Sequence, residues 1–240
     1  MSKLLNKVLK QFLEDRGFRI VRISRFGPAL DRLYQKTSNF KFVQIGANDG
    51  VSFDSLYPFV TSHPCSGIVI EPLPDVFEKL YQNYRAHPQI IPLNVAIHRD
   101  KSEATLYRID PDKIAQLGTP WVAGMASFSI NHLQNPGITP ELILEQKVRC
   151  VPLMDAIESH GMMGAQLLQI DTEGYDAEII KMIDFSRFRP GFIKYEWVHI
   201  SDKALKETKG LLRRQGYRIM KDKYDILAIL SAGLRRYLPW

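Results

Sequence analysis

The segment FVQIGANDG, residues 42–50, constrains the fold of this chain more than any other feature. An apolar run of strand length ends there in a glycine turn that carries an acid, Asp49. Gly46 and Gly50 allow the backbone to approach a ligand closely. The next apolar run, GIVIEP, also ends in an acid, Glu71. A strand, a glycine turn and an acid after the second strand predict a nucleotide-binding crevice in an α/β sheet.

The acid in the glycine turn indicates which nucleotide would fit. A dinucleotide-binding loop reads G-x-G-x-x-G and sets a pyrophosphate on a helix N-terminus, whereas Gly46 and Gly50 here enclose three residues that include Asp49. A carboxylate a few ångströms from a pyrophosphate would cost about 1–4 kcal/mol, depending on the local dielectric. S-adenosylmethionine (SAM) has no phosphate and carries a positive ammonium and sulfonium. The turn therefore favours SAM over NAD.

Strand and helix signals alternate along most of the chain. We expect strands at 42–45, 67–70, 90–97, 104–109, 165–171, 192–197, 217–220 and 225–230. We expect helices at 2–15, 74–85, 152–160, 177–183 and 202–215. Strands separated by helices predict a doubly wound sheet, and the last two strands have no helix between them. The predicted fold is a Rossmann-like α/β fold with a seven-stranded, mostly parallel sheet, an antiparallel last strand and helices on both faces. This is the shape of class I SAM-dependent methyltransferases.

The chain divides into three predicted parts. Residues 1–38 form an amphipathic helix and lead-in, residues 39–232 a SAM-binding domain, and residues 233–240 a tail. The helix at 2–15 is expected to pack on the domain as a lid or as an element of an oligomer. Residues 110–147 contain several prolines and glycines that break regular structure, among them Pro111, Pro120, Gly124, Pro136 and Gly137, so we expect an irregular acceptor or lid region there.

Composition narrows the class of protein. No apolar run approaches the roughly 20 residues of a membrane-spanning helix, and the N-terminus lacks the apolar core of a signal peptide. Cys65 and Cys150 are far apart in sequence, which favours reduced thiols and a cytoplasmic location. The net charge of +6 is explained by a basic face in solvent, with an anionic substrate or peripheral membrane contact as alternatives. No basic run is interleaved with aromatic residues, so we expect no nucleic-acid partner.

Acids follow two further predicted strands. Asp171 ends an apolar run and is followed by Glu173, and Glu196 ends the next run and is followed by His199. Carboxylates beside a histidine can supply a general base. They can also bind Mg²⁺ through oxygen ligands, for which Asp171 and Glu196 are the candidates. The acid at Asp176 needs no such role, because a helix N-terminus favours negative charge.

The chain resembles the FkbM family of SAM-dependent methyltransferases from about residue 40 to 230. The matching pieces are FVQIGANDG, GIVIEPLPDVFEKL, LNVAI, ASFS, VPLMDAI, LLQIDTEGYDAEIIKMID and IKYEWVHIS. The IDTEG block is the most specific of them, and Asn48-Asp49 departs from the broader G-x-G-x-G pattern in a way that suits this family. The resemblance implies methylation of hydroxyl groups on sugars, polyketides and related small molecules.

The resemblance also implies roles for individual residues. The glycine turn would hold the methionine part of SAM, Glu71 the ribose hydroxyls, and Asn94 and Ala96 would lie near adenine. The residues expected to contact SAM are Gly46, Ala47, Asn48, Asp49, Gly50, Glu71, Pro72, Asn94, Ala96 and Asp171. The residues expected at the reacting centre are Asp171, Glu173, Glu196 and His199, with His199 as the first choice of base.

Other functions remain as alternatives. An NAD(P)-linked oxidoreductase is disfavoured by the missing third glycine and by Asp49. A nucleic-acid base methyltransferase usually shows a (D/N)-P-P-(Y/F) tetrapeptide, which is absent. A non-catalytic accessory protein with the same fold stays open, although intact acids at three strand ends argue against it.

Overall fold

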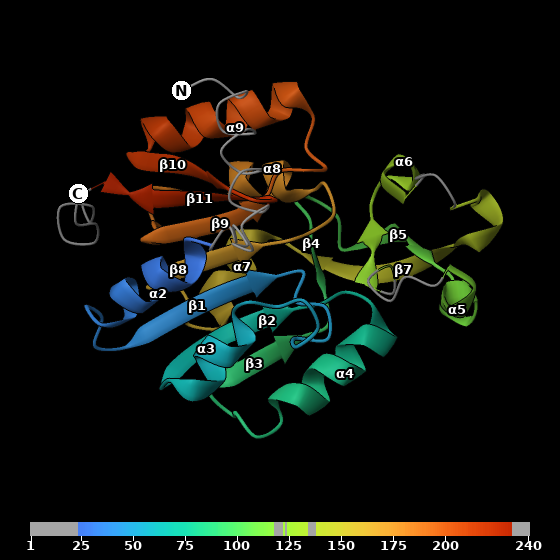
Figure 1. Cartoon of the computed structure of the whole chain (residues 1–240), viewed down its shortest axis with the longest axis horizontal. Helices are drawn as coiled ribbons and strands as arrows, with labels where there is room; N and C mark the ends of the chain where they lie inside the picture. Colours follow the sequence, from blue (N-terminus) through green and yellow to red (C-terminus); the bar gives the residue numbers. More distant parts are fainter. Residues whose placement is uncertain (1–23, 118–121, 123, 134–137, 232–240) are drawn as a thin grey trace, which may run out of the picture.

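A seven-stranded sheet forms the centre of the molecule in a computed structural model that describes residues 24–117, 122, 124–133 and 138–231. Its strands lie in the order β10-β11-β9-β8-β1-β2-β3 (Figure 1). The bounds are β1 Phe40–Ile45, β2 Cys65–Ile70, β3 Ile90–Leu93, β8 Leu167–Ile170, β9 Phe192–Glu196, β10 Tyr217–Asp222 and β11 Asp225–Leu230. β11 runs antiparallel to the other six strands, which are parallel to one another. The predicted seven-stranded, mostly parallel sheet with an antiparallel last strand is confirmed.

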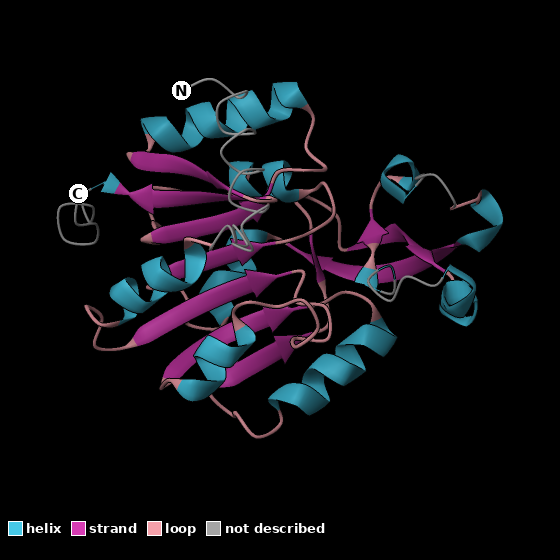
Figure 2. Cartoon of the chain, viewed as in Figure 1, coloured by secondary structure: helices cyan, strands magenta, loops and turns pink. Residues whose placement is uncertain are grey.

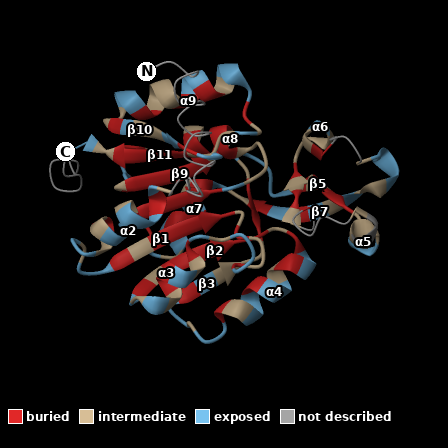
Figure 3. Ribbon diagram, in the orientation of Figure 1, coloured by how far each residue is buried: buried red, intermediate tan, exposed pale blue. Residues whose placement is uncertain are grey.

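Helices cover both faces of this sheet, as Figure 2 shows. On one face, Val43 and Ile45 of β1 belong to an apolar cluster that includes residues of α7 (Leu153–Ser159), α8 (Asp176–Lys181) and α9 (Asp202–Arg214). On the other face, Phe40 and Phe42 pack against α2 (Phe26–Tyr34), α3 (Tyr57–Ser62) and α4 (Pro74–Tyr84). Burial on both faces is why the central strands read as nearly continuous apolar runs, and Figure 3 shows these strands as the buried centre.

The helix ends follow ordinary capping rules. Ser201 precedes α9, and its side chain accepts a hydrogen bond from the backbone N–H of Ala204. Arg213 and Arg214 lie in the last turn of the same helix, where positive charge is favoured. The first residue of α4 is Pro74, whose missing N–H costs nothing at that position. These signals explain why the predicted helices at 74–85 and 202–215 agree with the structure to within one residue.

A second, four-stranded sheet lies beyond the carboxyl ends of the central strands (Figure 1). Its order is β4-β7-β5-β6, with β4 Ala96–Ile97, β5 Glu103–Ile109, β6 Ala126–Ser127 and β7 Ile143–Val151. The prediction of one strand at 90–97 was wrong, because Asn94 and Val95 separate β3 from β4 and the two belong to different sheets.

The prediction that residues 110–147 are irregular was also wrong in part. β7 begins at Ile143 and pairs with β5 along the full length of β5. Short helices precede it: η1 Pro111–Lys113, α5 Ile114–Leu117, α6 Ile130–Leu133 and η3 Pro140–Leu142. β7 escaped detection because much of it is solvent-exposed, so its apolar residues do not alternate regularly.

Two segments predicted from the sequence fall outside the described residues. The amphipathic helix at 2–15 and the tail at 233–240 both lie there. Within the predicted lead-in, α2 was not expected, and it packs Phe26, Leu30 and Leu33 into the core. No helix in the described part of the chain is long and apolar enough to cross a membrane. Cys65 and Cys150 are both buried free thiols.

Candidate active site

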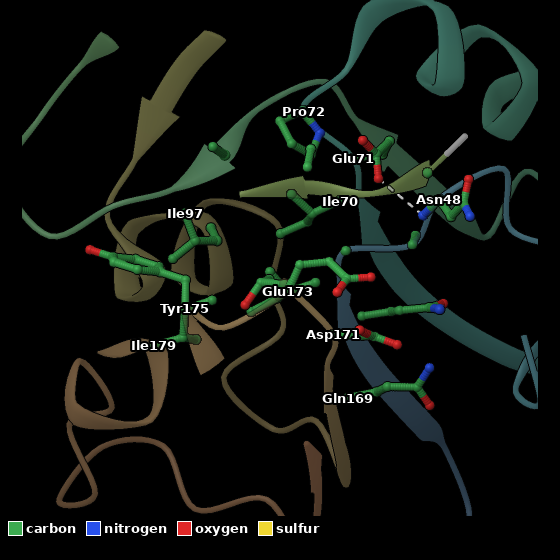
Figure 4. A pocket seen from close by; sticks show the side chains of 18 of the residues that line it. Asn48, Ile70, Glu71, Pro72, Ile97, Gln169, Asp171, Glu173, Tyr175 and Ile179 are labelled. Carbon is green, nitrogen blue, oxygen red and sulfur yellow. Dashed lines mark hydrogen bonds between the residues drawn. The ribbon is translucent and has the colours of Figure 1, made fainter. Parts of the chain in front are cut away.

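A cavity of about 210 Å³ opens at the carboxyl edge of the main sheet, between the ends of β1, β2 and β8 and the second sheet. Its two ends differ in chemistry (Figure 4). Ile97, Tyr175 and Ile179 form an apolar end, whereas Gln169 and Asp171 lie at a polar end. An elongated cavity with one apolar and one polar end suits a ligand with an aromatic group at one end and charges at the other.

The glycine turn after β1 forms part of the cavity wall through Gly46, Ala47 and Asn48. Gly46 has a φ of +74°, and a Cβ built on it would lie 1.6 Å from the carbonyl oxygen of Asp171. Only glycine therefore allows β1 and β8 to approach at this point. Asn48 also adopts a positive φ, of 51°, which asparagine tolerates better than most residues.

Glu71 is buried at the end of β2, with 5% of its surface exposed, and lines the cavity. Its carboxylate accepts hydrogen bonds from the backbone N–H groups of Asn48 and Leu73, both at 3.0 Å. Burial raises the pKa of Glu71 to about 7, although these bonds and the nearby Arg108 oppose the shift. Carboxylate oxygens keep unused lone pairs after one bond each, so Glu71 can still accept from ligand hydroxyls.

Asn94 supports the cavity from outside it. Its side-chain amide donates to the carbonyl oxygens of Glu71 and Pro72, at 2.9 and 3.1 Å. Pro72 and Ala96 line the cavity, but Asn94 does not. Asn94 therefore fixes the turn that carries Glu71.

The Asp49 carboxylate accepts hydrogen bonds from residues of its own turn. Its carboxylate accepts from the N–H groups of Val51 and Ser52, at 2.9 and 2.6 Å, and from the Ser52 hydroxyl. Burial alone would raise the pKa of Asp49, but the bonds from Ser52 and Val51 outweigh it and lower the pKa. Asp49 and Gly50 do not line the cavity, and a Cβ on Gly50 would collide with α4. The predicted contact of Asp49 with SAM therefore has no support from this placement.

The acids after β8 and β9 come together with His199 beside the cavity. His199 Nε2 lies 3.3 Å from Glu173 Oε2 and 3.8 Å from Glu196 Oε2. Glu173 and Asp171 line the cavity itself. The Oε2 atom of Glu196 is buried and accepts no hydrogen bond from any described residue. The structure thus brings together three of the four residues expected at the reacting centre, and Asp171 faces the same cavity.

Crowding of negative charge changes the proton affinities in this cluster. Burial, followed by repulsion from Asp176, raises the pKa of Glu173 to about 7. Burial and the charges of Asp171 and Glu173 raise the pKa of Glu196 to about 9. Asp171 is open to solvent through the cavity mouth but surrounded by protein, and burial and the neighbouring acids raise its pKa as well. Burial and the nearby His132 lower the pKa of His199, so its ring is neutral at pH 7.

The same cluster has the composition of a metal site. One donor atom from each of Glu173, Glu196 and His199 lies within 4.8 Å of the other two. Two carboxylates and an imidazole are ligands that Mn²⁺, Fe²⁺ or Zn²⁺ accept, whereas Mg²⁺ prefers oxygen alone. Of the two Mg²⁺ candidates predicted from the sequence, Glu196 belongs to this group and Asp171 does not.

Two residues that position the cluster were not identified from the sequence. The Ser127 hydroxyl donates to the carbonyl oxygen of Glu173 at 2.9 Å and lies 3.0 Å from His132 Nδ1, so β6 and α6 are tied to the turn after β8. Asp176 is fully buried, and it accepts hydrogen bonds from Thr172 and from the N–H of Glu196. Asp176 therefore does more than favour the helix N-terminus: it links the ends of β8 and β9.

The fold and site define the class of protein. The sheet is mostly parallel, its strand order reverses between β1 and β8, and it ends in the antiparallel pair β10 and β11. Together with a glycine turn after β1 and an acid after β2, this is the class I methyltransferase fold. A family model described as "Methyltransferase FkbM domain" matches residues 44–219. The chain belongs to the FkbM methyltransferase family, whose members use SAM.

Solved structures with this fold are distant in sequence. The FkbM methyltransferase from Methylobacillus flagellatus KT is 17% identical with a TM-score of 0.49, over 80% of this chain and 43% of that one. The fibrillarin pre-rRNA processing protein of Methanococcus jannaschii is 15% identical with a TM-score of 0.42, over 89% and 82%. A methyltransferase from Geobacter sulfurreducens is 11% identical with a TM-score of 0.42, over 96% and 91%. No curated protein matches this sequence.

Proposed function

We propose that this protein transfers the methyl group of SAM to a hydroxyl oxygen of a sugar, glycan or other natural-product acceptor. The observation that supports this most directly is the position of Glu173. Figure 4 shows its side chain between the apolar residues Ile97 and Tyr175 and the polar residues Gln169 and Asp171. A carboxylate at the middle of the cavity lies where a group that accepts a proton from the acceptor would be needed.

The cavity residues fit the parts of SAM. The apolar end at Ile97, Tyr175 and Ile179 suits the adenine ring, and the Glu71 carboxylate suits the two ribose hydroxyls. SAM, when bound, supplies a methyl group on a positively charged sulfur. The neighbouring acids Asp171 and Glu173 provide the negative surroundings that such a charge favours.

Glu173 and His199 together can remove the acceptor proton. With a pKa near 7, Glu173 holds and releases a proton at neutral pH, which is what an efficient general base requires. His199, 3.3 Å away, is neutral and can share that proton or pass it to solvent. Bound SAM would supply the methyl group to the acceptor oxygen and would leave as its neutral sulfide. The hydroxyl proton goes to the Glu173–His199 pair.

The cofactor is tested by calorimetric titration of the full chain with SAM, and with NADH as the control. We expect micromolar binding of SAM and no binding of NADH. NADH binding without SAM binding would instead support an oxidoreductase. SAM binding without methyl transfer to any member of a panel of sugars, glycans and polyketides, with and without EDTA, would favour an accessory protein.

The base is tested by Glu173→Gln and His199→Asn. We expect kcat to fall about 10²–10⁴-fold in both variants, because these groups act on the acceptor proton. The Kd for SAM should stay within a few-fold in His199→Asn and should rise in Glu173→Gln, which also removes a negative charge from the cavity wall. Glu178→Gln is the matched control, since Glu178 lies on nearby α8 but pairs with Lys181 at 2.7 Å. Unchanged turnover in both site variants would rule out this pair as the base.

A further inference from the structure

The side of α9 that faces away from the main sheet carries a row of basic residues. Lys203, Lys206, Lys209 and Arg213 follow one another at intervals of three or four residues, so they lie along one side of the helix. Lys203, Lys206 and Arg213 are exposed and Lys209 is half-buried. The other side of α9 packs into the core, and the helix lies beside β10, the last strand at one end of the main sheet (Figure 1).

Few acids oppose this basic row. Residues 202–223 contain eight lysines and arginines but only three acids, a surplus of five positive charges in a chain whose net charge is +6. Of the acids, Asp222 is buried, Glu207 lies 3.8 Å from Lys181, and Asp202 lies in the first turn of α9, where negative charge is favoured. None of the four residues of the row forms an ion pair within the described part of the chain.

The basic side chains of α9 and β10 are close enough to repel one another. Burial, followed by the charges of Lys221 and Arg213, lowers the pKa of Lys209. Like charges that are held close together on a surface favour a partner of the opposite charge. The face therefore suits an anionic partner.

The shape and the aromatic residues of this face favour a lipid surface over a nucleic acid. A helix at the rim of a domain is convex, whereas single-stranded nucleic acids are bound in a groove with rings on which the bases stack. The ring of Trp197 is not open for stacking, because Lys221 Nζ lies 3.2 Å from its centroid. Tyr224, in the turn between β10 and β11, is 69% exposed, and tyrosine is favoured at the level of lipid headgroups.

Both ends of the described chain lie against β10. The Ser24 hydroxyl donates to Asp222, the last residue of β10, at 2.6 Å. The N–H of Ser231 donates to the carbonyl oxygen of Gly216, just before β10, at 2.8 Å. The sequences beyond these ends are also basic, with six lysines and arginines against two acids in residues 1–23, and two arginines and no acid in residues 232–240. Both segments therefore join the molecule at the strand that borders α9.

We propose that the α9–β10 face, made of Lys203, Lys206, Lys209, Arg213 and Lys221, binds the anionic surface of a lipid bilayer. Each lysine or arginine near such a surface raises the affinity about five-fold. This mode of binding needs no membrane-spanning helix. None of residues 202–223 lines the cavity, so the inference goes beyond the proposed function and does not depend on it.

Flotation of the full chain with lipid vesicles tests this inference. We expect the protein to bind vesicles of equal parts phosphatidylcholine and phosphatidylglycerol at about 0.1 M salt, and to be released at about 1 M salt, where the Debye length falls from about 10 Å to about 3 Å. Vesicles of phosphatidylcholine alone should not bind it. The double variant Lys206→Gln/Arg213→Gln should bind the anionic vesicles about 30-fold more weakly, because two of the charges are lost.

Lys79→Gln/Arg85→Gln is the matched control. These two residues are exposed at α4, which packs on β3 at the opposite end of the main sheet, and their loss should leave binding unchanged. Single-stranded RNA at the same phosphate concentration should not remove the wild-type protein from the vesicles. No binding of the wild type to anionic vesicles, equal losses in the two double variants, or release by the RNA would overturn the inference, and each would leave the proposed function intact.

Discussion

At the scale of single residues, ionisation of the Glu196 carboxyl lowers the stability of the folded protein. Its Oε2 atom is buried without a hydrogen-bond donor among the described residues, and the charges of Asp171 and Glu173 lie close by. Burial and these charges raise its pKa from the usual 4.5 to about 9 in the folded protein. Below pH 4.5 the Glu196 carboxyl keeps its proton in both the folded and the unfolded protein. As the pH rises toward 9, the carboxyl loses its proton readily only in the unfolded protein. Folding therefore loses stability over this range.

Glu196→Gln is expected to remove that loss. The variant should be more stable than wild type by about 1–3 kcal/mol at pH 7, with no advantage near pH 4.5. Urea unfolding at both pH values measures the difference. A variant that is less stable than wild type at pH 7 would contradict the charge crowding described for this cluster. Natural sites commonly keep such destabilising groups because they serve function.

Gly46 offers a second prediction at this scale. Gly46→Ala must place a methyl group against the Asp171 carbonyl at a φ of +74°. Gly161→Ala is the matched control, since Gly161 has a φ of +68° and nothing within 4 Å of its Cβ position. We expect Gly161→Ala to lower the free energy of unfolding by about 1–2 kcal/mol through backbone strain alone. The loss for Gly46→Ala should be larger by about 1–3 kcal/mol because of the collision, and thermal unfolding of both variants separates the two effects.

At the scale of elements, the sequence predicts most strands of the main sheet because their burial on both faces leaves an uninterrupted apolar signal. The strand at 42–45 and the acid Glu71 are examples. β7 was not predicted, because its apolar residues do not alternate regularly. α2 was not predicted although Phe26, Leu30 and Leu33 follow a helical spacing, because no capping side chain marks its start. In the site, the glycine turn identified the cavity but not its buried polar lining residues Gln44, Gln169 and Lys194, because these lie inside strands. Only strand register brings those three together.

An ion pair and an apolar cluster link the second sheet to α4 on the cofactor side of the fold. Arg108 of β5 is 4% exposed and binds both carboxylate oxygens of Asp75 in the first turn of α4, one of them at 2.9 Å. Asp75→Ala should lower the free energy of unfolding by about 1–3 kcal/mol. The loss is smaller than for breaking a fully buried ion pair, because the Asp75 side chain is half exposed. Adding Arg108→Met to the Asp75→Ala variant should restore much of the lost free energy of unfolding, because no unpaired buried charge remains. A double-mutant cycle by urea unfolding measures the coupling, and additive effects would show that the pair does not join the two elements.

At the scale of the whole molecule, the carboxyl groups of the site make the stability of the free protein depend on pH. Burial is the main reason why the pKa values of Glu71 and Glu173 rise to about 7 and that of Glu196 to about 9, from the usual 4.5. The folded state therefore binds more protons than the unfolded state between pH 4.5 and 9. The free energy of unfolding should fall as pH rises through that window and level off above it.

Ligand binding should act in the opposite direction. SAM at 100 times its Kd adds about 2.7 kcal/mol to the free energy of unfolding if it binds only the folded state. The positive charges of SAM also favour ionised carboxylates around the cavity, so this gain should be greater at pH 8 than at pH 6. Thermal unfolding with and without SAM at both pH values tests this. A larger shift at pH 6 would mean that the carboxyl groups meet the ligand in their protonated form, and that their raised pKa values serve hydrogen bonding to the ligand rather than charge.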